Sequence, residues 1–408
     1  MKILYLHQYF LRPEEGGAIR SWYLAKGMVD EGHEVEMITS HNQKEYLYKE
    51  VDGIKVHYLP VYYDNKQGFI GRAMAFVRFV WLAWKMASQI KDVDYCYATS
   101  TPLTIGLIAL RLKKKKGIPY IFEVRDLWPE APIQMGAVKN PLLKSYLRSL
   151  EKKIYKSADK IIALSPGMRD GIEKACPGKP IYIIPNLSDC QFFKPEIKEP
   201  SLMRKYNTDG KFVITYFGAI GKVNHLEFLL EALKAVESAG LENVIFLVVG
   251  KGSELRRIQY MAASQSLQQI HFLGYQNKEG LREILNITDA VYISFADKPV
   301  LETNSPNKFF DGIAAGKLIL VNTKGWIRNM VEEKECGFGY NPYQPEEFVS
   351  MLLPFVTDKS KLISAQKNSR NLAEQHFSKD IQVARLMKIM NNESRMNDST
   401  SSVYILTA

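Results

Sequence analysis

Short, nearly uninterrupted runs of β-branched and aromatic residues recur along this chain, and stretches of helical periodicity separate them. Such runs are typical of strands that helices cover on both faces. In the first half the predicted strands are residues 2–7, 33–39, 118–124, 160–164 and 181–186. In the second half they are residues 211–217, 244–249, 271–275, 290–295 and 318–321. This alternation predicts two parallel sheets of the doubly wound α/β class.

The alternating pattern pauses once, between residues 189 and 209, where the sequence is rich in Pro and Lys and has no periodicity. We therefore expect an N-terminal domain at 1–188, a linker at 189–209 and a C-terminal domain at 210–375. A helix at 376–390 is expected to pack back on the first domain. The polar, Ser- and Thr-rich segment 391–408 is expected to be a disordered tail.

Composition narrows the class of partner and the compartment. The chain has 408 residues, a net charge of +10 and a pI near 9.1, which favours anionic partners. Its four cysteines show no CxxC pair and no metal-ligand spacing, as expected of a protein in the reducing cytosol. The apolar run at the N-terminus is too short for a signal peptide and is predicted to be a strand.

One stretch in the second half carries a helix start of chemical interest. Ser305 is a natural N-cap, Pro306 suits the first helical position, and Gly316 is expected to end the helix. A helix that begins at the carboxyl edge of a parallel sheet offers free N–H groups and a positive dipole end to an anion.

Two charged residues lie in this helix. Lys308 falls in the first turn, where a cation is unfavourable unless an anion is near, and Asp311 could accept hydrogen bonds from hydroxyls. We expect a phosphate at the helix start and a ribose beside Asp311. The alternative is a capped helix whose Lys308 is only solvated.

The first half carries two candidate ligand loops. The loop after the first strand ends in Gly16-Gly17, which is not a GxGxxG dinucleotide motif and could be a simple turn or a close approach to a ligand. The strand at 118–124 leads into Arg125 and Asp126, at the sheet edge where ligands bind in open α/β folds. These two side chains either belong to a site or pair with each other.

Two further segments bear on membranes. Residues 71–91 are largely apolar, but Arg78 and Lys85 interrupt them, so the pattern predicts an interfacial or partly buried helix and not a spanning one. The basic run 111–116 is either a solvated helix end or a contact for anionic lipid. These clusters favour a membrane surface over a nucleic-acid groove.

Several motifs occur in a familiar order. They are Gly16-Gly17, Glu-Val-Arg-Asp-Leu-Trp-Pro at 123–129, Gly-Ala-Ile-Gly-Lys at 218–222, Val-Gly-Lys-Gly at 249–252, and Ser-Pro-Asn-Lys at 305–308 followed by Ala-Ala-Gly at 314–316. Over residues 1–390 the chain resembles the family-four retaining glycosyltransferases of the GT-B fold, and within them the WbuB-type branch. The resemblance implies two Rossmann-like domains facing a central cleft, the first for the acceptor and the second for a nucleotide sugar.

The resemblance also assigns roles to residues. Arg125, Asp126 and Lys222 fall at catalytic positions, with Arg125 where the family has a histidine. Ala219 stands where the family has an arginine. The family's two glutamates fall on Thr303 and Asp311, which leaves open whether Thr303 or its neighbour Glu302 replaces the first. The residues expected to bind the donor are Gly16, Gly17, Gly218, Gly250, Gly252, Ser305, Pro306, Asn307, Lys308 and Asp311.

The expected reaction follows from the resemblance. A retaining transfer would move a sugar, with UDP-N-acetyl-L-fucosamine or a related UDP-amino sugar as donor, to a polyprenyl-diphosphate-linked saccharide in O-antigen or capsule synthesis. No cofactor is expected besides the donor, and no metal, because no Asp-x-Asp lies at a suitable place. The protein would be cytoplasmic and peripheral at an anionic membrane surface, without nucleic acid. The alternatives are a nucleotide-sugar 2-epimerase of the same architecture and a non-catalytic module that binds membranes or polyanions.

Overall fold

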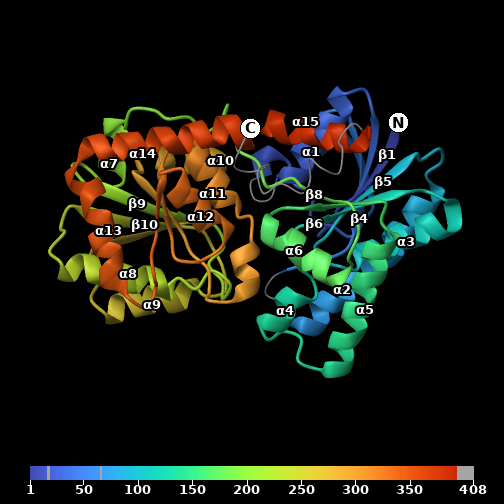
Figure 1. Cartoon of the computed structure of the whole chain (residues 1–408), viewed down its shortest axis with the longest axis horizontal. Coiled ribbons are helices and arrows are strands. Elements are labelled where there is room, and N and C mark those ends of the chain that lie inside the picture. Colours follow the sequence, from blue (N-terminus) through green and yellow to red (C-terminus); the bar gives the residue numbers. More distant parts are fainter. Residues whose placement is uncertain (16–18, 65–66, 393–408) are drawn as a thin grey trace. The chain divides into compact units, whose positions relative to one another are not determined.

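The computed structural model describes residues 1–15, 19–64 and 67–392, which form two compact units (Figure 1). Among these residues, unit 1 comprises 1–13, 19–185 and 380–392, and unit 2 comprises 14–15 and 186–379. Each unit has its own sheet with helices on both faces. The α/β class with two Rossmann-like sheets is therefore confirmed.

Unit 1 is organised around an eight-stranded sheet in the order β3-β4-β2-β1-β5-β6-β7-β8. All neighbouring strands are parallel except β3 and β4, which form an antiparallel hairpin. The strands are β1 (Lys2–Leu6), β2 (Glu34–His41), β3 (Leu47–Val51), β4 (Ile54–Pro60), β5 (Tyr95–Thr99), β6 (Tyr120–Val124), β7 (Lys160–Ala163) and β8 (Ile181–Ile183). The order reverses at β1, which is where α/β sheets place their ligand crevice.

The helices of unit 1 cover the two faces of this sheet. Helices α1 and α15 pack on one face, where their apolar side chains join a core formed by β1, β2 and β5, and the others lie on the opposite face (Figure 1). The helices are α1 (Arg20–Asp30), α2 (Phe69–Gln89), α3 (Ile105–Lys116), α4 (Glu130–Gln134), α5 (Pro141–Ser157), α6 (Pro166–Ala175) and α15 (Lys379–Met390). Coverage on both faces explains why the central strands β1 and β6 are buried at nearly every position.

Helix α15 is the last described element of the chain, and it packs against the first helix. Leu386, Met387 and Ile389 belong to the core of unit 1. A Cβ built on Gly27 of α1 would lie 2.3 Å from Val383 Cγ1, so glycine at this position lets the two helices approach closely. The first and the last described elements, β1 and α15, therefore belong to the same unit.

Unit 2 contains a six-stranded sheet in the order β11-β10-β9-β12-β13-β14, and all its pairs are parallel. Its strands are β9 (Phe212–Phe217), β10 (Val244–Val249), β11 (Ile270–Gly274), β12 (Ala290–Ile293), β13 (Leu318–Val321) and β14 (Gly337–Gly339). Its helices are α7 (Pro200–Lys205), α8 (Glu227–Ser238), α9 (Leu255–Ser264), α10 (Lys278–Ile287), α11 (Asn307–Ala314), α12 (Trp326–Glu333), α13 (Pro345–Thr357) and α14 (Lys359–Leu372). Short 3₁₀ turns occupy Pro13–Glu15 and Pro299–Thr303, and a π-helical turn, Ala373–Phe377, precedes α15.

The segment 189–209, which we expected to be a linker, lies within unit 2 and contains α7. Asp189 at its start is buried and accepts a 2.9 Å contact from Lys278 Nζ. The units divide after Pro185 and not at 188. The contact of Asp189 with Lys278 anchors the start of the segment to unit 2. Hydrophobic periodicity cannot predict such an anchor, because the anchor is an ion pair. Residues 393–408 of the expected tail lie outside the described residues.

No helix within the described ranges is long and apolar enough to cross a membrane. Three of the four cysteines, Cys96, Cys176 and Cys336, are buried free thiols.

Candidate functional site

The carboxyl edge of the unit 2 sheet carries two glycine loops that follow β9 and β10. Gly218 N donates to Val249 O at 3.0 Å, and Ile220 N donates to Lys251 O at 3.0 Å, so the loops prolong the pairing of the two strands. A Cβ on Gly250 would lie 1.9 Å from Gly218 O, and one on Gly252 would lie 2.1 Å from Ile220 O. The glycines at 250 and 252 are therefore needed for contact between the loops. A contact with a ligand remains a prediction for Gly218, Gly250 and Gly252.

Lys308 of α11 lies beside these loops and is buried, with 7% of its surface exposed. Its Nζ donates to the Tyr216 hydroxyl at 3.0 Å and to Asn224 Oδ1 at 3.1 Å, and lies 4.1 Å from the centre of the Tyr216 ring. A Cβ on Gly218 would lie 3.6 Å from the same nitrogen. The expectation of a merely solvated Lys308 is therefore wrong.

The charge of Lys308 has no opposite partner in the described part of the chain. The groups that contact its Nζ are a hydroxyl and a neutral amide. Burial lowers the pKa of Lys308 to about 7. A buried ammonium that is not balanced by a carboxylate creates a place where an anion would be stabilised.

The start of α11 differs in detail from the expected cap. The helix begins at Asn307, Pro306 is the residue before it, and no side chain caps its first amides. The Ser305 hydroxyl instead accepts from Asn186 N at 3.1 Å, while Asn186 Nδ2 donates to Ser305 O at 2.6 Å. Ser305 is thus not the N-cap, because its hydroxyl is used to hold the loop. Gly316, with φ of 61°, ends the helix as expected.

Asp311, the expected ribose ligand, has different surroundings from Lys308. Burial raises the pKa of Asp311 to about 7, the charge of Lys278 lowers it and that of Asp189 raises it. Lys308 instead contacts residues of the β9 strand and of the loop that follows it. The structure therefore brings Lys308, but not Asp311, into contact with the β9 loop, and the ribose contact remains a prediction.

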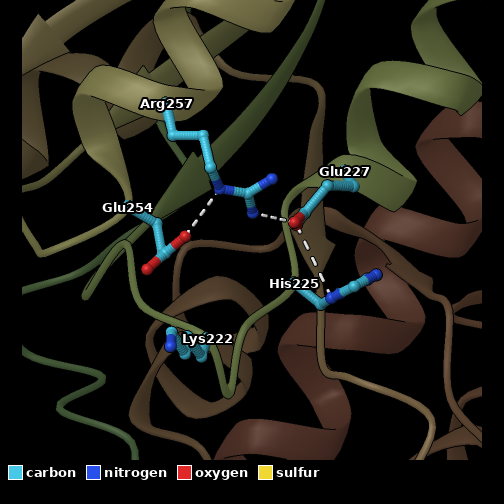
Figure 2. Close-up of a pocket in the computed structure, with 5 residues that line it drawn as sticks. All are labelled: Lys222, His225, Glu227, Glu254 and Arg257. Carbon is cyan, nitrogen blue, oxygen red and sulfur yellow. Dashed lines mark hydrogen bonds and ion pairs between the residues drawn. The ribbon is translucent and has the colours of Figure 1, made fainter.

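A cavity of about 520 Å³ opens beside the same loop, lined by Lys222, His225, Glu227, Glu254 and Arg257 (Figure 2). Arg257 joins the two glutamates: its Nη2 contacts Glu227, and its Nε lies 2.7 Å from Glu254 Oε2. His225 Nδ1 lies 3.6 Å from Glu227 Oε2. The carboxylates are therefore already engaged by cations of the protein.

Burial raises the pKa of Glu227, but the hydrogen bond from Arg257 and the charges of His225 and Arg257 outweigh it. The pKa of Glu227 consequently lies below its usual value, and the network keeps it ionised. Lys222 is exposed on the cavity wall, and no interaction joins it to the other four residues in Figure 2. Lys222 is part of the loop that follows β9, and Lys308 donates a hydrogen bond to Asn224 of the same loop. Both lysines therefore lie at this loop.

The second group of predicted residues lies in unit 1, at the ends of β1 and β6. Arg125 Nη1 lies 3.3 Å from His7 Nε2, and the Thr101 hydroxyl donates to Asp126 Oδ2 at 3.0 Å. The expectation that Arg125 and Asp126 pair with each other is therefore not met in the described contacts. Burial raises the pKa of Asp126, against the hydrogen bond from Thr101 and the charge of Arg125.

His7 is neutral in this arrangement. Burial, followed by the charge of Arg125, lowers the pKa of His7 well below its usual value. A guanidinium can only donate hydrogen bonds, so His7 Nε2 must accept one from Arg125. The proton of the neutral His7 ring therefore lies on Nδ1. That buried Nδ1 has no hydrogen-bond partner among the described residues. Arg125 and His7 together present polar groups at the sheet edge of unit 1.

Some predicted and some functional residues fall outside what motifs could locate. Gly16 and Gly17 lie outside the described residues. Tyr216, Asn224 and Arg257 were not predicted: Tyr216 reads as a strand residue, and the other two carry no motif. The only signal for Asn224 is its place two residues after Lys222. Within the described residues, no group of three or more His, Cys, Asp and Glu is arranged to hold a metal ion.

Two family models match the chain. A glycosyl transferase 4-like domain matches residues 15–186, and the domain of the glycosyl transferases group 1 matches residues 198–375. The chain belongs to the family-four glycosyltransferases. The two matches follow one another in the order of the two units, so this glycosyltransferase carries one family domain in each.

Related proteins have similar length but distant sequences. The glycosyltransferase is 22% identical over 288 residues to the probable glycosyltransferase WbjE of Pseudomonas aeruginosa. This match covers 69% of this chain and 71% of WbjE. It is 21% identical over 323 residues to WcaI of Escherichia coli K12, whose name assigns WcaI to colanic acid biosynthesis. This match covers 74% of this chain and 78% of WcaI.

Solved structures share the fold. Sucrose-phosphate synthase from Thermosynechococcus elongatus superimposes with a TM-score of 0.77 at 15% identity, over 96% of this chain and 98% of that one. Anabaena HepE in complex with UDP superimposes with a TM-score of 0.71 at 17% identity, over 96% of this chain and 100% of HepE. The glycosyltransferase therefore has the GT-B fold of two Rossmann-like domains, as predicted.

Proposed function

We propose that this glycosyltransferase moves a sugar, with retention of configuration, from a UDP-linked donor to a polyprenyl-diphosphate-linked saccharide in surface-polysaccharide synthesis. The observation that carries the donor half is Lys308, a buried ammonium without a carboxylate partner in the described chain, beside the two glycine loops. The uncapped first amides of α11 lie on the same helix. Together these groups suit a diphosphate.

The chemistry requires a positive environment where the donor breaks. When the bond from the sugar to the diphosphate lengthens, negative charge builds on the leaving phosphate and positive charge builds on the sugar ring. Cations and amides that are already in place stabilise this separation without having to reorganise. We assign this role to Lys308, Lys222 and the first amides of α11, and we propose that lysines replace a metal ion.

The donor and pathway assignments have separate support. UDP is favoured because HepE, which shares the fold, is described with UDP bound. Polysaccharide synthesis is favoured by the name of WcaI. UDP-N-acetyl-L-fucosamine, or a related UDP-amino sugar, remains our preferred donor, and O-antigen or capsule our preferred product, from the WbuB resemblance.

We place the acceptor in unit 1. Arg125 has no carboxylate contact among the described residues, and its guanidinium suits the diphosphate of a lipid-linked saccharide. Asp126 is held by Thr101 and is assigned to position the acceptor or the reacting sugar. Such a lipid substrate would keep the enzyme peripheral at the cytoplasmic face of a membrane.

The donor site is tested by calorimetric titration of the full chain with UDP, GDP, ADP and CMP. We expect UDP to bind best, and Lys308→Met to weaken UDP binding about tenfold or more, because a charge-assisted contact is lost. Lys317→Met is the matched control, since Lys317 is equally buried and its pKa is lowered to about 8, but the charges acting on it are those of Asp289, Lys198 and Glu196. Equal loss in both variants would remove Lys308 from the donor site.

The reaction class is tested by product analysis with the donor, with and without a lipid-linked acceptor. A transferase forms the glycosylated lipid only when the acceptor is present. An epimer or free sugar that forms without acceptor would favour the 2-epimerase alternative.

A further inference from the structure

Helix α2 of unit 1 is apolar on two faces, although the fold buries only one of them. The inward face packs on β2, β4 and α3 through residues such as Phe79, Ala83 and Ala87, all fully buried. The outward face exposes four large apolar side chains, Ile70, Met74, Val77 and Trp81, to between 61% and 73%. We call these four residues the α2 stripe.

The stripe is continuous along the helix. Its members are separated by four, three and four positions, the spacing that aligns side chains on one side of an α-helix. Single exposed apolar residues are ordinary on protein surfaces, whereas a contiguous row marks an interaction site. The stripe therefore indicates a partner with an apolar phase.

Basic residues accompany the stripe. Arg78 and Lys85 are exposed on the same face of α2, and the sequence from Phe69 to Gln89 contains no acidic residue. Lys114 and Lys115, exposed at the end of the neighbouring α3, have no ion pair in the described chain. The surroundings of the stripe are therefore positively charged.

Part of the basic run 111–116 is used within the fold. Lys113 pairs with Asp159, and Lys116 Nζ donates to Ser88 O at 2.7 Å, near the end of α2. The Arg111 guanidinium lies 5.9 Å from the Trp84 ring. The contacts of Arg111 and Lys116 join α3 to α2, and Lys114 and Lys115 stay exposed, so only part of the run is available to a partner.

We propose that the α2 stripe docks on the surface of an anionic lipid bilayer, with α2 lying in the plane of the interface. Apolar side chains would enter the acyl boundary, and Arg78 and Lys85 would contact the headgroups. A spanning arrangement is excluded for α2, because no described helix is suited to cross a membrane. A second copy of the chain fits less well, since a symmetric contact through α2 would bring Arg78 and Lys85 against like charges.

The docking surface is connected with the residues that we assign to the acceptor. Phe76, on another side of α2, contacts Trp128 with ring centres 6.3 Å apart and Tyr63 with ring centres 5.9 Å apart. Trp128 lies three residues after Arg125. An acceptor whose lipid stays in the bilayer would thus present its diphosphate near Arg125. This link rests on the proposed function, but docking itself does not.

The test is co-sedimentation of the full chain with vesicles of phosphatidylcholine alone and of phosphatidylcholine with phosphatidylglycerol. We expect binding to the anionic vesicles, and the double variant Met74→Ser, Trp81→Ser should lower the bound-to-free ratio about tenfold or more, because two large apolar contacts with lipid are lost. The matched control is Ile197→Ser, Tyr260→Ser, which removes two apolar residues exposed to 94% and 74% outside α2 and should leave binding unchanged.

Charge is tested separately with Arg78→Gln, Lys85→Gln, which should reduce the preference for anionic over neutral vesicles. Wild-type protein that does not sediment with anionic vesicles, or a stripe variant that binds as well as the control, would overturn the proposal. A dimer that the stripe variant abolishes, without vesicle binding, would show instead that the face is an interface between copies. UDP titration without vesicles separates the two proposals, because the stripe variant should bind UDP normally.

Discussion

Arg20 and Glu123 form a buried ion pair beneath the predicted acceptor loop, with Arg20 Nη2 at 2.8 Å from Glu123 Oε1 and neither side chain more than 1% exposed. Glu123 also accepts from the Tyr97 and Thr99 hydroxyls, at 2.8 and 3.1 Å. Burial raises the pKa of Glu123, but the charges of Arg20 and Arg125 outweigh it, and its pKa lies below the usual value. Glu123 is therefore ionised and fixes β6 to the start of α1.

Glu123→Gln should destabilise unit 1 by about 3–5 kcal/mol, because it leaves the Arg20 charge buried without its counterion. The measurement is the shift in the urea unfolding midpoint, followed by circular dichroism. Asp30→Asn is the control, since Asp30 pairs with Lys26 on the exposed side of α1 and should change stability by less than about 1 kcal/mol. Equal shifts of the unfolding midpoint in the two variants would show that the buried Arg20–Glu123 pair contributes no more to stability than the exposed Lys26–Asp30 pair.

UDP affinity should fall as the pH rises above neutrality. The pKa of Lys308 is about 7 in the free protein, and a bound diphosphate would raise it, so UDP binding takes up a proton above pH 7. We expect the dissociation constant to rise about tenfold for each pH unit above 7, until the pKa of the complex is reached. Below pH 7 this dependence should disappear.

Titration of UDP by calorimetry across this pH range measures the effect. Lys308→Met should give a flatter profile, because methionine carries no proton to lose. A wild-type profile as flat as that of the variant would contradict the assignment of this side chain to the donor phosphates.

Gly250→Ala should destabilise unit 2 by about 3 kcal/mol or more. The new Cβ would lie 1.9 Å from Gly218 O, and the φ of 148° at Gly250 is one that alanine rarely adopts. Thermal unfolding of the full chain measures the loss. Gly221→Ala is the matched control, because no atom lies within 4 Å of its added Cβ, and a similar loss there would contradict the loop-contact explanation.

Lys222→Ala should slow turnover by roughly a hundredfold, as expected when one preorganised cation is removed from the leaving group. Folding should not change, since Lys222 is exposed. Lys234→Ala removes an exposed lysine from α8 and serves as the control, with a normal rate expected. A near-normal rate for Lys222→Ala, measured with saturating donor and acceptor, would exclude it from the mechanism.

Local signals predicted much of the fold. The start of helix α5 (Pro141–Ser157) is marked in the sequence, because Asn140 caps it and Pro141 suits its first position. The hairpin of β3 and β4 was missed, although Asp52-Gly53 marks its turn with φ of 54° and 81°. Hydrophobic periodicity is weak there because β3 is mostly exposed at the sheet edge. Exposure explains why the edge strand β3 was missed, but not why β5, a buried central strand, was missed as well.

The site was predictable only in part. Lys308 could be placed in the first turn of a helix from its neighbours Ser305 and Pro306. Its contacts with Tyr216 and Asn224 could not be predicted from the sequence. They depend on β12 lying next to β9 in the sheet, which is a property of the topology. The separate surroundings of Asp311 have the same origin.

The packing of α15 on unit 1 has a consequence for making the two halves of this enzyme separately. Unit 2 is nearly a single stretch of chain, 186–379, so one gene fragment can encode it. Unit 1 is assembled from the chain before residue 186 and from helix α15, and a fragment that stops at residue 185 would expose the apolar surface that Leu386 and Met387 cover. Fusing residues 380–392 to that fragment through a flexible linker would restore the missing cover and give a unit 1 protein suitable for study by itself.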